Sequence, residues 1–232
     1  MLEKPKGKRV SRYKKAEEEA TGKLVNLTPL NDNQRDYLNS LKTSNQTIVC
    51  GYSGTGKTYI AATYAANMYL SKQIDWIIVT RPVVSVGKDL GYFKGDLNEK
   101  FTPWAAPVLD VLEQQLGGAY ETGIKNGNIV LSPLSTMRGR SFNNAFVLLD
   151  EAQNTTVAEM KMFLTRIGSN SKVVINGDIR QSDIKEASGL SKIIHMAKKY
   201  KMDIPVIEFG IEDIVRSDAC RDWIINFEKE GI

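Results

Sequence analysis

Short runs of apolar residues alternate along the chain with segments whose apolar residues recur at helical spacing. The apolar runs predict strands at 47–50, 76–79, 129–131, 146–149, 173–175 and 206–209. Several of these runs are apolar throughout, which is typical of strands that are buried on both faces of a parallel sheet. Helical spacing predicts helices at 32–42, 57–70, 107–116, 156–167, 190–200 and 218–229. The alternation predicts one α/β domain with a mostly parallel central sheet that is flanked by helices.

Length and composition limit the class of protein. The chain has 232 residues, which is enough for one α/β domain and short for two of that kind. No run of about 18 apolar residues is present, so we expect no membrane-spanning helix. The first residues lack the apolar stretch of a secretion signal. Cys50 and Cys220 do not have the spacing of metal ligands, and we expect a reduced, cytoplasmic location.

The net charge of +4 is concentrated at the amino terminus. Residues 1–24 are rich in charge and poor in apolar side chains, so we predict a disordered tail there and an ordered domain at 25–232. Such a tail can simply aid solubility, or it can contact a phosphate backbone. Its basic residues are Lys4, Lys6, Lys8, Arg9, Arg12, Lys14 and Lys15.

A phosphate-binding loop is predicted at residues 51–58, between a predicted strand and a predicted helix. The segment matches the pattern G-x-x-x-x-G-K-[ST], and its position between strand and helix is the context that this pattern requires. Backbone N–H groups at a helix amino terminus can surround phosphates, a lysine can reach the β- and γ-phosphates, and a hydroxyl can ligate Mg²⁺. We therefore expect ATP and Mg²⁺ as ligands. The residues of this site are Gly51, Ser53, Gly54, Thr55, Gly56, Lys57 and Thr58.

Two carboxylates, Asp150 and Glu151, follow the apolar run at 146–149. In P-loop enzymes an aspartate at the end of a second strand holds Mg²⁺. A neighbouring glutamate can take the proton from an attacking water. On its own the pair could be a solvated acidic turn. Together with the P-loop it predicts Asp150 as a metal ligand and Glu151 as the catalytic base.

Two glutamines are candidates for contacts with the nucleotide. Gln181 follows the apolar run at 173–175 and could sense the γ-phosphate or the attacking water. Gln34 lies in the predicted helix before the P-loop, where an amide could pair with the edge of adenine. Gln34 could equally be a plain surface residue.

The succession of short segments along the chain resembles the PhoH-like family of P-loop ATPases. The match runs from about Leu27 to near the carboxyl terminus and keeps the order of the family. Besides the P-loop, the matching segments are Arg81-Pro82-Val83, Leu90-Gly91-Tyr92-Phe93-Lys94-Gly95-Asp96-Leu97, Met137-Arg138-Gly139-Arg140-Ser141-Phe142, Asp150-Glu151-Ala152-Gln153-Asn154-Thr155-Thr156, Leu164-Thr165-Arg166-Ile167-Gly168, Gly177-Asp178 through Gln181, Ser188-Gly189-Leu190 and Asp213-Ile214-Val215-Arg216.

The resemblance implies a single RecA-like domain similar to the ATPase core of superfamily 1 helicases. It implies that Gln34 reads adenine, that Lys57 and Thr58 serve the phosphates and Mg²⁺, and that Gln181 senses the γ-phosphate. It also implies the roles of metal ligand and catalytic base for the carboxylate pair.

An arginine is expected to stabilise the charge that develops on the transferred phosphate. In two-domain helicases the second domain supplies it, and this chain has no room for one. We therefore expect a neighbouring subunit to supply it in a homo-oligomer, such as a ring or a hexamer. The main candidates are Arg166 and Arg216, with Arg138 and Arg140 as further ones; any of them could instead form a surface ion pair.

Basic residues and aromatics that suit single-stranded nucleic acid occur in two segments. The first contains Arg81, Lys88 and Lys94, and the second contains Arg138 and Arg140. The first segment could instead be a solvated insertion that packs through its aromatics. The sequence thus predicts an ATPase coupled to RNA or single-stranded DNA. The alternative is an ATP-dependent switch or assembly protein without a nucleic-acid substrate, and a small-molecule kinase fits less well.

Overall fold

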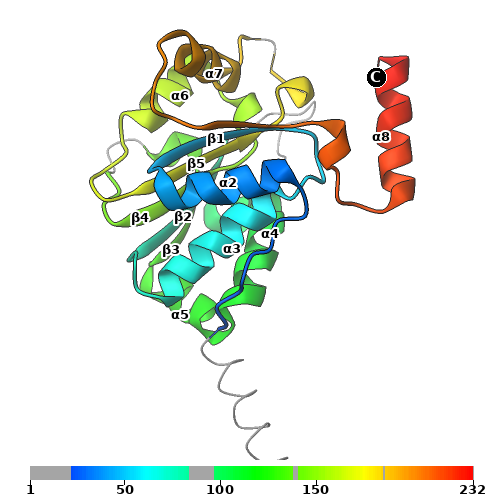
Figure 1. Ribbon diagram of the computed structural model, residues 1–232. Coiled ribbons are helices and arrows are strands. Elements are labelled where there is room, and N and C mark those ends of the chain that lie inside the picture. Colours follow the sequence, from blue (N-terminus) through cyan, green and yellow to red (C-terminus); the bar gives the residue numbers. More distant parts are fainter. Residues whose placement is uncertain (1–21, 84–96, 138–140, 185, 232) are drawn as a thin grey trace, which may run out of the picture.

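Six strands form one sheet in the computed structural model, which describes residues 22–83, 97–137, 141–184 and 186–231 (Figure 1). The strands are β1 (Gln46–Gly51), β2 (Trp76–Arg81), β3 (Ile129–Pro133), β4 (Ala145–Leu149), β5 (Lys172–Gly177) and β6 (Val206–Phe209). The helices are α2 (Asp32–Thr43), α3 (Lys57–Leu70), α4 (Leu97–Leu116), α5 (Gly118–Asn126), α6 (Val157–Leu164), α7 (Gly189–Lys199) and α8 (Asp218–Glu230). Single 3₁₀ turns are η1 (Leu134–Met137), η2 (Ala152–Asn154), η3 (Ile179–Gln181) and η4 (Ile211–Asp213).

The order of strands in the sheet is β3-β2-β4-β5-β1-β6, and every neighbouring pair is parallel. All six carboxyl ends therefore lie at one edge. β5 separates β1, which leads into the P-loop, from β4, which leads into the carboxylate pair. The prediction of an α/β domain with a parallel sheet is confirmed.

Two apolar layers cover the sheet, one on each face. Phe146 and Leu148 of β4 pack into the layer formed with α2, α3 and α4. Val147 and Leu149 point the other way, into the layer formed with α6 and α7. Figure 1 shows α6 and α7 on one side of the sheet and α2, α3 and α4 on the other. Since successive side chains of a strand face opposite sides, burial on both faces requires the unbroken apolar runs that the sequence shows.

Two helices differ from the sequence prediction. α4 begins at Leu97, ten residues before the predicted start, and contains Pro103 and Pro107. Proline favours the first turn of a helix, which is why the sequence pattern placed the start at 107. α5 was not predicted, because Gly117 and Gly118 suggest a turn before a segment with few apolar residues.

The predicted helix at 156–167 is shorter in the structure, where α6 ends at Leu164. Its start is fixed by a capping box, in which the Thr156 hydroxyl accepts from the backbone N–H of Glu159. The Glu159 carboxylate in turn accepts from the backbone N–H of Thr156.

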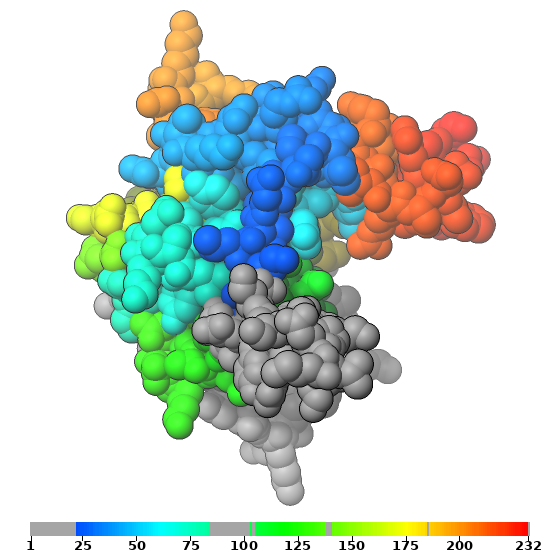
Figure 2. Space-filling model, turned by 60° about the horizontal axis from the view of Figure 1, so that its bottom comes forward, coloured from blue at the N-terminus to red at the C-terminus, as the bar shows by residue number. Residues whose placement is uncertain are grey.

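The amino-terminal residues of the described chain lie along the surface between the helices. The Lys23 N–H donates to the carbonyl of Gln115, 3.1 Å away, and Asn67 exchanges two hydrogen bonds with the backbone of Val25. Figure 2 shows this blue segment running from α2 across α3. Most of the predicted tail, 1–24, lies outside the described residues.

Residues 210–217, here called the strap, lead from β6 to α8. No residue of α8 is buried, and the helix projects from the body of the domain (Figures 1 and 2). Trp223 and Phe227 stack on its surface with their ring centroids 5.7 Å apart. In the part of the chain that the structure describes, no helix is both long and apolar enough to cross a membrane.

Candidate nucleotide-binding site

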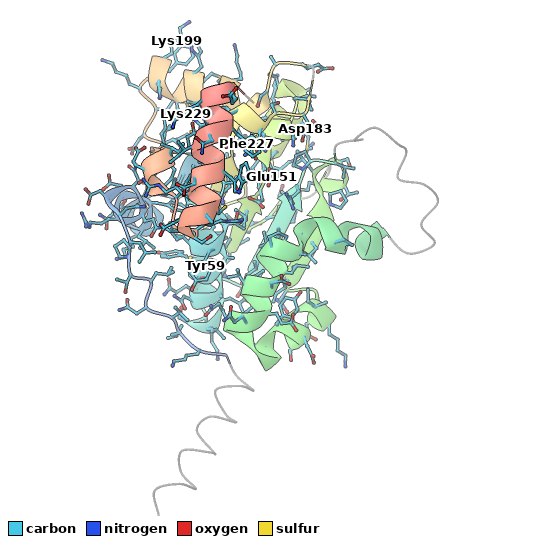
Figure 3. The ribbon with its side chains drawn as sticks, turned by 90° about the vertical axis from the view of Figure 1, so that its right-hand side faces the viewer. Tyr59, Glu151, Asp183, Lys199, Phe227 and Lys229 are labelled. Atoms are coloured by element: carbon cyan, nitrogen blue, oxygen red, sulfur yellow. The ribbon has the colours of Figure 1, made fainter. Side chains whose placement is uncertain are left out.

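A cavity of about 640 Å³ opens at the carboxyl edge of the sheet, here called the P-loop cavity. Its walls come from the loop after β1, the ends of β2, β4 and β5, η3, α2 and the strap. Figure 3 views the side of the molecule on which α8 stands, with Glu151 and Phe227 labelled. The polar residues that line the cavity include Gln34, Ser53, Lys57, Thr58, Arg81, Asp150, Glu151, Asp178, Gln181 and Arg216.

The P-loop has the backbone shape that a phosphate cradle needs. Gly54 and Gly56 have φ angles of 81° and 89°, in the left-handed region that favours glycine. The loop ends at the amino terminus of α3, a helix of 14 residues that starts at Lys57. The N–H groups and the dipole of a helix amino terminus attract anions. These residues therefore fit the triphosphate of a nucleotide.

Lys57 lies at the centre of the loop. Its Nζ donates to the carbonyls of Gly51 and Tyr52, both at 2.7 Å. Burial lowers the pKa of the Lys57 ammonium, while the negative charges of Asp178 and Asp150 act in the opposite direction. The ammonium therefore lies between the loop and the carboxylates, where a bound phosphate would meet it.

Thr58 and Asp150 form the oxygen pair expected of a Mg²⁺ site. The Thr58 hydroxyl donates to Asp150 Oδ1 at 3.2 Å. Burial raises the pKa of the Asp150 carboxyl to about 6, and the positive charge of Arg81 opposes this shift. Among the described residues no three His, Cys, Asp or Glu side chains could hold a metal together. One carboxylate and one hydroxyl still suit Mg²⁺, which usually takes its remaining ligands from phosphates and water.

Glu151 is held on both carboxylate oxygens. Arg81 Nη2 lies 2.9 Å from Oε1, and Gln153 Nε2 donates to Oε2 at 2.6 Å. The backbone of Glu151 is left-handed, with φ of 54°. Its side chain is 41% exposed, whereas Gln153 is fully buried. Of the two carboxylates, Glu151 is thus more accessible than Asp150, whose side chain is 7% exposed. Glu151 lines the cavity and is held there by its two contacts.

Gln153 is a site residue that the sequence analysis missed. Its Oε1 accepts from the backbone N–H of Asp178 at 3.0 Å, so it links the end of β4 to the end of β5. Its Nε2 also lies 3.4 Å from the carbonyl of Gln181. The available signal was a glutamine two residues after Glu151 in a segment of the family pattern, but no role was assigned to it.

Gln34 lines the cavity but uses both ends of its amide within the protein. Its Oε1 accepts from the Leu30 N–H at 2.9 Å, and its Nε2 donates to the Thr55 carbonyl at 3.0 Å. One amide hydrogen and one lone pair remain for a ligand. Gln34 is buried, so it is not a plain surface residue; its contact with adenine stays a prediction.

Gln181 is the last residue of η3, is exposed, and lines the cavity. Its role as a γ-phosphate sensor stays a prediction. Asp178, which precedes η3, is buried beside it, and its Oδ2 has no hydrogen-bond partner among the described residues. Asp178 Oδ1 accepts from the backbone N–H of Arg180 at 3.2 Å.

The candidate arginines lie in different surroundings. Arg216 belongs to the strap and lies over the P-loop of its own chain: a Cβ on Gly54 would come within 2.9 Å of its side chain. The Val215 N–H donates to the Gly54 carbonyl at 3.0 Å. Arg166 follows α6, is not part of the cavity wall, and its Nε has no partner among the described residues.

Arg81, which the sequence analysis assigned to a nucleic-acid surface, lies in the wall of the cavity, and its contact with nucleic acid stays a prediction. Its side chain is 15% exposed and pairs with Glu151 inside the cavity. The cause is the sheet order: β2 lies beside β4, and the Asp150 N–H donates to the Thr80 carbonyl at 2.9 Å. The other residues expected to bind nucleic acid, Lys88, Lys94, Arg138 and Arg140, lie outside the described residues.

The comparisons with known proteins agree with this geometry. The family described as PhoH-like protein matches residues 26–228. Protein PhoH of Escherichia coli (strain K12) is 44% identical over 196 residues, which cover 82% of this chain and 55% of the relative. The PhoH-like protein of Bacillus subtilis (strain 168) is 40% identical over 215 residues, which cover 91% of this chain and 66% of the relative. The chain thus spans between half and two thirds of the length of these relatives.

Among solved structures, the UvsW helicase of bacteriophage T4 is similar with a TM-score of 0.49 and 13% identity, over 90% of this chain and 69% of that one. The family match covers most of the chain and includes the P-loop, the carboxylate pair and the strap. The chain therefore belongs to the PhoH-like protein family, with the cavity of a P-loop NTPase.

Proposed function

We propose that this chain hydrolyses ATP with the help of Mg²⁺ and couples hydrolysis to RNA or single-stranded DNA. The observation that supports hydrolysis is the meeting of Lys57, the Thr58–Asp150 pair and Glu151 in one cavity. A phosphate cradle alone would bind a nucleotide. A glutamate that is exposed beside the metal pair adds a base for an attacking water.

The roles follow from position. Backbone N–H groups of the P-loop and the Lys57 ammonium hold the β- and γ-phosphates. Thr58 and Asp150 would hold Mg²⁺, which neutralises charge on the phosphates when it is bound. Glu151 accepts the proton of the water that attacks the γ-phosphate. Gln181 contacts that phosphate or water, and Gln34 reads adenine through the free sites of its amide.

Chain topology supports a nucleic-acid partner at the edge of the sheet that holds the cavity. The segment with Lys88 and Lys94 begins just after the carboxyl end of β2. The segment with Arg138 and Arg140 begins after η1, which follows the carboxyl end of β3. Both basic segments thus follow, in chain order, two strands that are neighbours in the sheet, as β2 pairs with β3.

Phosphate release from ATP, with and without single-stranded RNA or DNA at two salt concentrations, tests the coupling. We expect stimulation by one polymer of several-fold, weakened by salt because phosphate contacts release counterions. Hydrolysis that ignores both polymers would favour the alternative, an ATP-dependent switch or assembly protein.

An oligomer is part of the proposal, with Arg166 reaching a neighbouring subunit; Arg216 already lies over the P-loop of its own chain, so it would serve the site of that chain. The stacked pair Trp223 and Phe227, 66% and 48% exposed, supports a surface available for assembly. The free thiols of Cys50 and Cys220 support a reducing, cytoplasmic setting. Specific activity should fall on dilution in step with the mass measured by light scattering. Full activity in a strictly monomeric sample would contradict a trans arginine and, with it, a required ring or hexamer.

A further inference from the structure

The carboxylate of Glu151 is fixed from two sides by residues that no motif assigns to catalysis. Arg81 comes from the end of β2 and contacts Oε1 at 2.9 Å. Gln153 comes from η2 and contacts Oε2 at 2.6 Å. An arginine guanidinium gives a charge-assisted bond, which is about twice as strong as a neutral one.

Both partners are themselves held in place. Arg81 is 15% exposed and also lies 3.9 Å from Asp150 Oδ2, through its Nε. Gln153 is 1% exposed, and its Oε1 accepts the N–H of Asp178 at the end of β5. The position of Glu151 is therefore set by three strand ends rather than by its own rotamer preferences.

The backbone of Glu151 gives a second reason to expect a functional constraint. A left-handed conformation at a residue other than glycine is strained, and it persists only where the surroundings hold it in place. Here the two side-chain contacts and the bond from the Asn154 N–H to the Glu151 carbonyl, at 3.1 Å, hold the residue on both its side chain and its backbone. Without them a side chain that is 41% exposed would turn freely toward solvent.

Charge adds a third reason. Asp150 and Glu151 are adjacent carboxylates in a cavity that, under the proposed function, receives the negative charge of a triphosphate. Arg81 lies against both of them, with Nη2 2.9 Å from Glu151 Oε1 and Nε 3.9 Å from Asp150 Oδ2. A neutral side chain at position 81 would leave the repulsion between the two carboxylates, and between them and a bound triphosphate, without a nearby positive charge to offset it.

We propose that Arg81 and Gln153 are positioning residues that clamp the catalytic base Glu151 within the same chain. The proposal rests on the proposed ATPase function. Neither side chain makes a hydrogen bond or ion pair with residues 51–58, so we expect the clamp to act on the rate of hydrolysis more than on nucleotide binding.

The test compares Arg81→Ala, Arg81→Lys and Gln153→Ala with the intact chain. Displacing a catalytic group by about 1 Å can cost about 10²-fold in rate. We expect kcat to fall by about 10- to 100-fold in both alanine variants, with the affinity for MgADP changed less than about threefold. Arg81→Lys keeps the positive charge, so its kcat should lie between those of Arg81→Ala and the intact chain. Arg35→Ala is the matched control, since Arg35 pairs with Asp32 on the surface and should behave as the intact chain.

Chemical rescue gives a reading that a merely structural role would not produce. Guanidinium ion, below denaturing concentration, should restore part of kcat in Arg81→Ala and leave Gln153→Ala and Arg35→Ala unchanged. Mixing Arg81→Ala with Glu151→Gln should not raise activity above the sum of the two, because clamp and base belong to one chain. Recovery on mixing would contradict the clamp within one chain.

Two further outcomes separate this proposal from the proposed function. If the intact chain hydrolyses ATP, Glu151→Gln does not, and both Arg81→Ala and Gln153→Ala keep kcat within about twofold, the clamp is wrong while the ATPase stands. If Arg81→Ala loses MgADP affinity as strongly as kcat, Arg81 binds nucleotide instead. If the intact chain shows no hydrolysis, the proposed function fails, and the clamp fails with it.

Discussion

At the residue scale, the P-loop cavity depends on backbone shapes and close approaches that few side chains allow. Gly54 has a φ of 81°, and the aliphatic part of the Arg216 side chain lies 2.9 Å from the position that a Cβ would take. Gly56 has a φ of 89°, and a Cβ on it would lie 3.0 Å from Gln34 Nε2. The loop is thus shaped by neighbours on the strap and α2 as well as by its own glycines.

Gly54→Ala should weaken both folding and nucleotide binding. The left-handed conformation costs alanine about 1 kcal/mol, and the Arg216 side chain must move away from the loop. We expect a loss of about 1–3 kcal/mol in unfolding free energy and at least a tenfold loss in MgADP affinity. Gly127→Ala is the control, because Gly127 has a φ of 75° but nothing near its Cβ position and lies outside the cavity wall. Equal MgADP affinity in the two variants would contradict the role given to Gly54.

The two thiols should differ in reactivity. Burial raises the pKa of the Cys50 thiol to about 11, with a smaller contribution from the charge of Glu208. Since only the thiolate reacts, about one Cys50 thiol in a thousand is reactive at pH 8. Iodoacetamide followed by mass spectrometry should therefore modify the half-buried Cys220 first and Cys50 only after unfolding. Modification of native Cys50 at the rate of Cys220 would show that β1 opens.

Residues in a continuous motif were predictable, and residues brought in from other strands were not. The spacing of the P-loop fixes Lys57 and Thr58, and an apolar strand that ends in two carboxylates marks Asp150. Arg81 was assigned to a different surface, because its neighbours in sequence are basic and aromatic. Only the pairing of β2 with β4 places it beside the carboxylates.

At the element scale, the strap connects α2, the P-loop and α8. Asp213 Oδ2 accepts from Asn33 Nδ2 at 2.6 Å and from the Gly210 N–H at 2.8 Å. The Asn31 side chain donates to the Asp213 carbonyl at 3.3 Å. Two residues later the strap bonds to Gly54. One buried carboxylate therefore fixes the segment that covers the P-loop.

Asp213→Ala should release the strap. It leaves the part-buried Gly210 N–H and Asn33 amide without their acceptor, which should cost about 1 kcal/mol, the lower end of the range for a buried group that loses its partner. Chemical denaturation should show this loss, and MgADP titration should show weaker binding because the support of Gly54 is lost. Asp213→Asn keeps an acceptor oxygen and should cost less. A variant as stable as the intact chain would mean that the strap is held by other contacts.

The elements with a clear period and sharp ends were predicted well, and those with mixed signals were not. α3 has the predicted bounds, since the P-loop glycines fix its start. The predicted α4 was too short and α5 was not predicted, because proline and glycine act as local stop signals in the sequence. Tertiary packing overrides these signals. Val108, Leu112 and Leu116 of α4 are fully buried, and this burial outweighs the local preference.

At the scale of the whole molecule, parallel pairing of all six strands brings residues far apart in sequence to one edge. Lys57, Arg81, Glu151 and Gln181 come from four different connections and line one cavity. The sequence predicted the parallel sheet and the P-loop that follows its first strand. It did not predict the neighbours of each strand end, which depend on the order of strands.

Phosphate release and MgATP binding, measured side by side for the intact chain and Glu151→Gln, test the central claim most directly. Removing a general base usually costs about 10²–10⁴ in rate, while an amide of the same size preserves the cavity. We expect Glu151→Gln to bind MgATP about as tightly as the intact chain and to release phosphate at least about a hundredfold more slowly. Equal rates of release in the two proteins, or no release from the intact chain, would contradict hydrolysis at this site.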